Sequence, residues 1–165
     1  MKDPQVLQKI FLFQDLETEE LTRLLRFARS CRVAAREVVI HEGEQGDSMY
    51  IMCEGEVEIT KRLTLALAED TPKERVMIRL RAEDGVVFGE MALLENDLRS
   101  ATVTALTDCY LLEIRRNDFL DFINQDQRIG CKILLRLAQN LSRNLRKTNL
   151  EVVKLTTALA IALGG

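Results

Sequence analysis

The sequence contains a single histidine, His41, which excludes metal sites and catalytic schemes that need two or more imidazole side chains. It also lacks a basic excess: because 23 Lys and Arg residues stand against 26 Asp and Glu residues, no overall positive field can hold polynucleotide phosphates. The longest apolar run, Ala158–Leu163, is far shorter than the ~20 residues that cross a bilayer. We therefore expect no nucleic-acid surface and no membrane anchor, and any anion must be bound by a local site.

The four cysteines stand far apart, and no pair has the C-x-x-C spacing of a metal knuckle or a redox dithiol. They are Cys31, Cys53, Cys109 and Cys131. We interpret them as small buried hydrophobic side chains, because free cysteine packs well and the N-terminus shows no secretory signal. The expected location is the cytoplasm, and the spacing of the cysteines argues against a redox sensor.

With 165 residues the chain has the size of one domain, and its pattern changes from helical to β and back to helical. Residues 1–35 are predicted to form N-terminal helices, because leucines recur at helical spacing after an acidic helix start at Thr18–Glu20. Residues 36–115 contain short β-type runs between turns, which favours a sandwich or barrel, with Glu69–Pro72 at an exposed hairpin tip. The runs are Val38–Ile40, Met49–Met52, Val57–Thr60, Val76–Leu80, Ala101–Leu106 and Tyr110–Ile114.

Residues 116–165 are predicted to form a hinge and a C-terminal dimerisation helix, with Asn117 and Asp118 as candidate N-caps. A heptad pattern of mostly apolar residues, here called the seam, runs along the long helix. Its members are Leu134, Ala138, Leu141, Leu145, Thr148, Val152, Leu155, Leu159 and Ala162. Residues 133–162 would be ~45 Å long as a helix, more than a domain of this size can cover, which favours self-association. The alternative is a helix that lies on its own barrel.

The most informative segment is Val87–Val103, in which Gly89 and Glu90 precede a short helical turn and Arg99 precedes a strand. Free N–H groups at a helix start attract an anion, and an arginine fork can bind two phosphate oxygens. A carboxylate only accepts hydrogen bonds, so Glu90 suits a sugar hydroxyl. A site for a phosphate beside a site for a sugar indicates a nucleotide-binding pocket. The alternative interpretation is that Arg99 and Glu90 form an ion pair with each other over a solvated loop.

Four stretches of the chain together resemble the cyclic-nucleotide-binding domain family, of the type shared by catabolite activator proteins and protein kinase A regulatory subunits. They are Gly46–Ile51, Glu54–Val57, Phe88–Leu93 and Arg99–Val103, and the match covers the chain from Ile10 to Asn149. The resemblance implies a mainly β fold, a double-stranded β-helix (jelly-roll) barrel with N-terminal helices and a long C-terminal helix. It also implies that Gly46 and Gly55 hold barrel turns.

The same resemblance implies a phosphate-binding cassette, with Gly89 and Glu90 at the ribose and Arg99 at the exocyclic phosphate oxygen. Ser100 and the backbone of Ala92 would lie beside the phosphate. The ligand-binding residues implied in this segment are Phe88, Gly89, Glu90, Met91, Ala92, Arg99, Ser100 and Ala101. Leu98 stands where many members have proline, and the Ser100 hydroxyl can serve either cAMP or cGMP.

The run Arg136–Asn149 resembles the dimer helix of the activator-type members, in which a Thr-Ser pair meets the adenine, one residue from each subunit. The matching pair here is Thr148 and Asn149. Both can accept a hydrogen bond from the exocyclic amine of adenine, which favours cAMP over cGMP. The alternative is that Thr148 is merely tolerated in the seam. The helix-turn-helix of the activator-type members has no match in the 165 residues, so no direct DNA binding is expected.

We therefore expect a binding module and not an enzyme, since no kinase, cyclase or triphosphate-loop motif occurs. The expected ligand is cAMP, or less favourably cGMP, with no metal, and the expected assembly is a homodimer through the C-terminal helix. Closure of the cassette would move Leu93 relative to the family's hinge helix and relay binding to an unknown protein partner. The hinge residues would be Phe119, Leu120, Phe122 and Ile123. The alternative is a structural dimerisation module with a vestigial nucleotide pocket.

Overall fold

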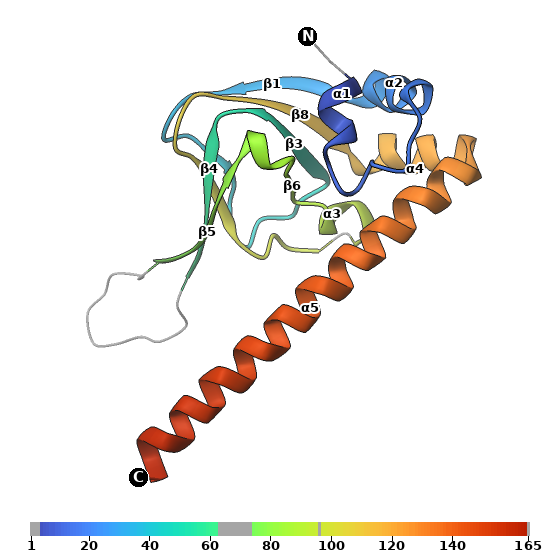
Figure 1. The fold of residues 1–165 in the computed structure, drawn as a ribbon. Helices are drawn as coiled ribbons and strands as arrows, with labels where there is room; N and C mark the ends of the chain where they lie inside the picture. Colours follow the sequence, from blue (N-terminus) through green and yellow to red (C-terminus); the bar gives the residue numbers. More distant parts are fainter. Residues whose placement is uncertain (1–3, 63–73, 96, 165) are drawn as a thin grey trace.

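The computed structural model describes residues 4–62, 74–95 and 97–164. Helices lie at both ends of the chain and strands fill the middle, as the sequence predicts (Figure 1). The helical elements are α1 (Pro4–Gln8), α2 (Thr18–Phe27), the 3-10 turn η1 (Ala82–Asp84), α3 (Met91–Leu94), α4 (Arg116–Gln125) and α5 (Gln127–Gly164). The strands are β1 (Arg29–Val33), β2 (Val38–Ile40), β3 (Ser48–Glu54), β4 (Glu56–Arg62), β5 (Glu74–Arg81), β6 (Val87–Phe88), β7 (Thr102–Ala105) and β8 (Cys109–Arg115).

Across the described ranges the strands form two four-stranded antiparallel sheets, in the orders β1-β8-β3-β6 and β2-β7-β4-β5. This arrangement of two sheets with flanking helices is the predicted jelly roll, and the fold class is confirmed. One detail of the prediction is wrong, because the sheets are not closed into a barrel. The edge strands β6 and β2 have only two and three residues, so no continuous ladder joins one described sheet to the other.

The central strands β3 and β8 of the first sheet are buried on both faces, because the second sheet covers one face and the helices cover the other. Side chains alternate along a strand, so Leu111 of β8 packs between the sheets while Leu112 and Ile114 pack against the helices. Met52 and Ile51 of β3 divide in the same way. This double burial explains why β3 and β8 are nearly continuous apolar runs.

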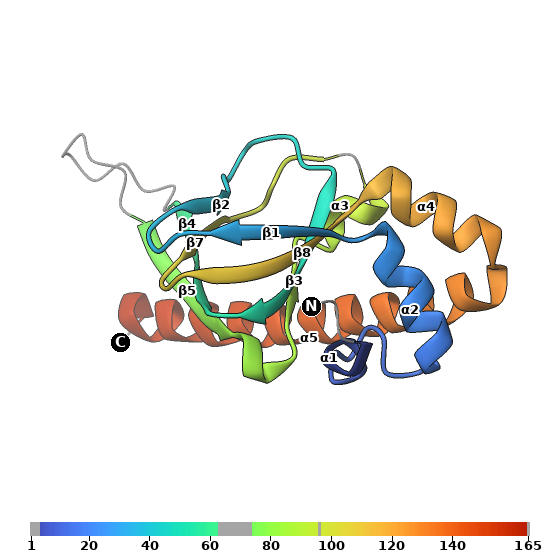
Figure 2. The same cartoon turned by 90° about the horizontal axis from the view of Figure 1, so that it is seen from above.

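The helices α1, α2 and α4 gather at one end of the sandwich, and α5 passes beneath the strands (Figure 2). The rings of Phe27 and Phe122 lie 5.3 Å apart between α2 and α4. The first turns of α5 bury Ile129, Ile133 and Leu137, each contributing about 1.5–3 kcal/mol of hydrophobic stabilisation. From Ser142 onward every described residue of α5 is exposed.

An ionic contact between α2 and α5 supplements this apolar packing. The buried carboxylate of Glu20 accepts hydrogen bonds from Nζ of Lys132 at 2.8 and 3.0 Å and lies 3.6 Å from Arg128. Burial alone would raise the pKa of Glu20, but the hydrogen bonds from Lys132 and the backbone of Glu17, with the positive charges, outweigh burial and lower it. The charged form of Glu20 therefore stabilises the fold.

Three local expectations differ from the structure. β1 lies inside the range predicted to be helical, because its exposed Arg and Ser residues on an edge strand hide the β alternation. α4 begins at Arg116, so Asn117 and Asp118 lie in its first turn and are not its N-cap. Cys131 is exposed, Cys31 and Cys53 are half-buried, and only Cys109 is buried as expected. The expected hairpin tip at Glu69–Pro72 lies outside the described residues.

No helix in the described part of the chain combines the length and apolar character that a membrane span requires. Nor do the described His, Cys, Asp and Glu side chains form any group of three or more that could hold a metal ion.

Glu20→Gln removes the carboxylate that Lys132 and Arg128 contact, and we expect the free energy of unfolding near neutral pH to fall by about 1.5–3 kcal/mol. Because the pKa of Glu20 is lowered in the folded state, its contribution is present above the ordinary value of 4.5 and is lost as the pH falls through the folded-state value. The difference between wild type and variant in urea denaturation therefore shrinks on acidification. Glu19→Gln, an exposed acid in the same helical turn, serves as the control and leaves stability nearly unchanged.

Candidate functional site

The segment between β6 and β7, described over residues 89–95 and 97–101, contains α3 and carries most of the predicted site. Gly89 follows β6 with φ of 76°, a left-handed conformation that glycine adopts without penalty. A Cβ atom at Gly89 would also lie 2.8 Å from Nη1 of Arg99 and 3.2 Å from the backbone oxygen of Ser48. Both the backbone conformation and the close packing therefore require glycine at this position.

The Arg99 side chain is held by hydrogen bonds to the residue after β6 and to the first residue of β3. Its Nη1 donates to the backbone oxygen of Gly89 and its Nη2 donates to Oγ of Ser48, both at 3.3 Å. Gly46 makes room for this arrangement, because a Cβ there would overlap Nε of Arg99. Backbone hydrogen bonds from Arg99 to Glu44 and from Gly43 to Arg99, at 2.8 and 2.9 Å, fix the two loops together.

The Arg99 guanidinium is half-buried, and none of the described carboxylates forms an ion pair with it. Burial lowers the pKa of Arg99, while the phenol of Tyr50 and the carboxylates of Asp47 and Glu113 act in the opposite direction. The ordinary pKa of a guanidinium lies so far above neutral pH that the group stays charged there. A half-buried cation that only neutral acceptors contact is a site for a small anion.

Glu90 follows Gly89 in the chain and is the residue directly before α3. Burial raises the pKa of Glu90 above its ordinary value of 4.5, and a hydrogen bond involving its own backbone offsets only part of this. The carboxylate forms no ion pair with Arg99, so the solvated ion pair that the sequence left open is absent from the described residues. Glu90 is therefore free to accept hydrogen bonds from a ligand.

These groups line one cavity of about 460 Å³, a size within the range of small-molecule sites. All eight site residues predicted between Phe88 and Ala101 line it: Phe88, Gly89, Glu90, Met91, Ala92, Arg99, Ser100 and Ala101. Strands of the second sheet supply an apolar wall made of Ile40, Ile59, Ile78, Leu80 and Val103. The cavity thus offers a cation, an acceptor and an apolar surface to one ligand.

The structure does not bring Thr148 and Asn149 to this cavity. Both are exposed on α5, and the helix contributes Asn140 and Asn144 to the lining in their place. The two asparagines are four residues apart, which puts them on one face of the helix. Sequence reasoning missed them because many polar residues along α5 have equivalent spacing, and only the packing of the helix decides which of them face the strands.

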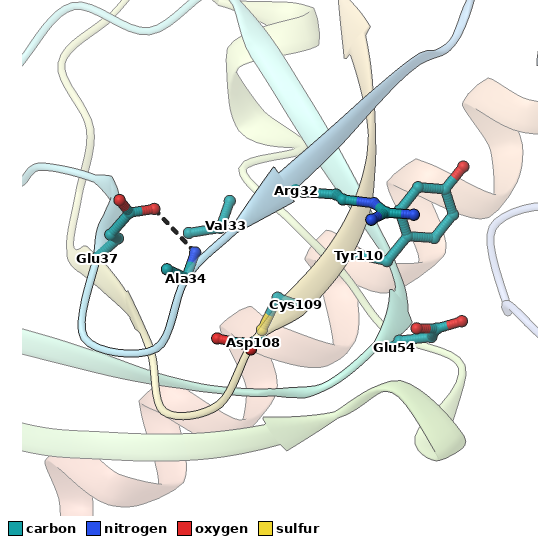
Figure 3. Close-up of a pocket in the computed structure, with 8 residues that line it drawn as sticks. All are labelled: Arg32, Val33, Ala34, Glu37, Glu54, Asp108, Cys109 and Tyr110. Carbon is teal, nitrogen blue, oxygen red and sulfur yellow. Dashed lines mark hydrogen bonds between the residues drawn. The ribbon is translucent and has the colours of Figure 1, made fainter.

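A second cavity, of about 650 Å³, lies away from this loop and is lined by Arg32, Val33, Ala34, Glu37, Glu54, Asp108, Cys109 and Tyr110. Figure 3 shows Glu37 turned back to accept a hydrogen bond from the backbone N–H of Ala34, at 2.8 Å. Asp108 likewise accepts from the backbone N–H of Ala35 at 2.9 Å. With three carboxylates against one guanidinium, this cavity repels an anion, so we assign the anion site to Arg99.

Comparison with known proteins gives a consistent result. The family model of the cyclic nucleotide-binding domain matches residues 30–126. A cyclic nucleotide-gated potassium channel of Rhizobium etli is 34% identical over 147 residues, which cover 89% of this chain and 34% of the channel. The chain therefore spans about a third of the length of this curated relative.

Solved structures agree with the sequence comparison. The catabolite activator protein of Thermus thermophilus superposes with a TM-score of 0.76 at 28% identity, covering 88% of this chain and 63% of that one. The regulatory domain of Toxoplasma gondii protein kinase A, crystallised with cAMP, gives a TM-score of 0.63 at 30% identity, covering 73% of this chain and 43% of that one.

Two glycine variants separate backbone strain from close packing in the loop. Gly89 and Gly43 both have positive φ, 76° and 85°, so alanine at either position costs about 1–2 kcal/mol. Only at Gly89 does the added Cβ meet neighbours, since nothing lies within 4 Å of one at Gly43. We expect Gly89→Ala to lower the free energy of unfolding by about 1–3 kcal/mol more than Gly43→Ala in urea denaturation. Equal losses would contradict the packing of Arg99 against Gly89.

Proposed function

Because the chain belongs to the cyclic nucleotide-binding domain family, we propose that it binds a cyclic nucleoside monophosphate in the cavity beside Arg99, with cAMP preferred to cGMP. The observation that carries this proposal is the half-buried Arg99 guanidinium, which faces the cavity with no carboxylate partner among the described residues. A cyclic phosphate has a single negative charge and two exposed oxygens, which suit one guanidinium fork. The protein would thus act as a binding module in the cytoplasm and not as an enzyme.

Glu90 and the apolar wall account for the rest of the ligand. The Glu90 carboxylate would accept a hydrogen bond from the ribose 2′-hydroxyl, and Ser100 with the backbone of Ala92 would lie beside the phosphate. The aliphatic side chains of the second sheet, including Ile40 and Val103, would cover the sugar and one face of the base. The regulatory domain of Toxoplasma gondii protein kinase A was crystallised with cAMP, which supports the adenine nucleotide.

The buried contact between α3 and α4 offers a route by which binding could reach the C-terminal helices. Leu93 of α3 belongs to the same core cluster as Phe119 and Phe122 of α4, and Leu120 and Ile123 pack against that cluster. Tightening of the cassette around a phosphate would displace Leu93 and with it the hinge helix. A ligand can drive this change only by its greater affinity for the closed state, and the output would go to a protein partner.

The exposed seam of α5 supports a homodimer. Leu145, Val152, Leu155 and Leu159 have exposed fractions between 51% and 66%. A heptad stripe of this kind is buried by a partner helix, and a second copy of the chain presents the same stripe. The contact of Thr148 and Asn149 with the base, one from each subunit, which the family resemblance implies, stays a prediction that the variants described below test.

Replacing Arg99 with alanine tests the ligand site. Arg99→Ala leaves the bound phosphate without its charged partner, so we expect the affinity for cAMP to fall by about 2–5 kcal/mol, or at least about 30-fold, in calorimetry. Arg32→Ala removes the guanidinium of the second cavity and serves as the matched control, with unchanged affinity. If wild type bound neither cAMP nor cGMP, or if Arg32→Ala had the larger effect, the proposal would be wrong.

Charges placed in the seam test the dimer. Leu145→Glu combined with Val152→Glu puts four carboxylates into a two-helix interface, so we expect a monomer in light scattering, with the circular dichroism of wild type. Leu150→Glu combined with Val153→Glu is the control, because these residues are equally exposed on α5 but lie off the seam. A wild-type monomer at high concentration would contradict the proposed dimer.

A further inference from the structure

The helix α5 is anchored against the N-terminal segment on both sides of Asn140. Arg136 forms a bidentate ion pair with Asp15, and its guanidinium lies 4.8 Å from the ring centre of Phe11. The guanidinium of Arg143 lies 3.8 Å from the same ring. These contacts fix the rotation of α5 about its own axis, so the face that carries Asn140 is set before any ligand binds.

Asn140 and Asn144 are the two residues of α5 that line the cavity. Both line it together with Glu90 and Arg99, which come from the segment between β6 and β7. Asn140 is half-buried and Asn144 is exposed, and neither side-chain amide has a hydrogen-bond partner among the described residues. The cavity therefore has two carboxamides without protein partners in the same lining as the charged groups that would hold the phosphate and sugar.

A carboxamide has a donor beside an acceptor, and this pattern matches adenine better than guanine. Adenine has an amine donor beside a ring-nitrogen acceptor on both of its outer edges, so an asparagine can form two hydrogen bonds to either edge. Guanine has two acceptors on its N7/O6 edge, and there the carboxamide oxygen would face an acceptor. On its N1 edge guanine has the O6 acceptor beside the N1–H donor, which a carboxamide also matches, so the preference for adenine arises when the N7 edge of the base faces α5.

We propose that Asn140 and Asn144 contact the purine base within a single chain and set the preference for adenine over guanine. This inference rests on the proposed function, and it replaces the pair expected from the family resemblance with residues that already lie in the cavity. Thr148 follows Asn144 by one further turn of α5 and, like Asn149, lies outside the lining. The base is thus read before a second subunit contributes any group.

The test compares three ligands on the full chain: cAMP, cGMP and the cyclic monophosphate of purine riboside, which lacks the exocyclic amine. Wild type should bind cAMP about 10-fold more tightly than cGMP, and about 5-fold more tightly than the purine riboside ligand. In the double variant Asn140→Ala with Asn144→Ala, the affinity ratios of cAMP to cGMP and of cAMP to the purine riboside ligand should both fall to about 2 or less, because the amide groups are gone. Alanine favours the helix, so α5 is retained.

Two control variants make the result specific. Gln139→Ala removes an exposed amide from the neighbouring position of α5 and should leave both ratios unchanged. Thr148→Val combined with Asn149→Ala should also leave them unchanged, and a loss of the ratios there would assign base reading to the pair expected from the family and overturn the inference. It would also be overturned if the Asn140 and Asn144 double variant kept the wild-type ratios, or if wild type preferred cGMP. Failure of the proposed function is distinct, because then wild type binds none of the three ligands.

Discussion

The candidate site depends on one constraint, the enclosure of the Arg99 guanidinium between two loops without a carboxylate to neutralise it. Gly46 and Gly89 leave the space that the side chain occupies, and Ser48 supplies a neutral acceptor at 3.3 Å. Ser48 in turn lies 3.5 Å from the hydroxyl of Tyr50, which lies 3.4 Å from Glu113. The Glu113 carboxylate is therefore kept two hydroxyl groups away from Arg99, and neither it nor Asp47 forms an ion pair with the guanidinium, which leaves its charge for an anion.

A second set of charges determines where α5 lies relative to that loop. Glu20 binds Lys132, and Asp15 binds Arg136, so the N-terminal segment holds the first half of α5 by ion pairs at two successive turns. Exposed ion pairs contribute little, but the Glu20 carboxylate is buried and hydrogen-bonded, which makes its contact directional. The direction of α5 in turn decides that Asn140 lines the cavity.

The helix α5 thus contributes to the cavity with one face and to the proposed dimer interface with another. The face with Asn140 and Asn144 turns toward the strands, and the seam with Leu145 and Val152 is exposed for a second copy. A change in the position of α5 would therefore alter the cavity and the seam together. This gives a physical link between the proposed ligand binding and the proposed dimer, since each would bias the same helix.

The sequence by itself determined the succession of helical, β and helical segments and the loop that joins Gly89 to Arg99, because periodicity, turn residues and a compact motif are local signals. The jelly-roll class followed from the family resemblance. It did not determine that the sheets remain open, that β1 is a strand, or that Glu90 and Arg99 line one cavity without pairing. Nor could it choose Asn140 over Thr148, since every polar residue of a long helix looks alike until packing fixes the helix rotation. That rotation comes from contacts between residues more than a hundred positions apart, such as Asp15 with Arg136, and only the tertiary structure brings them together.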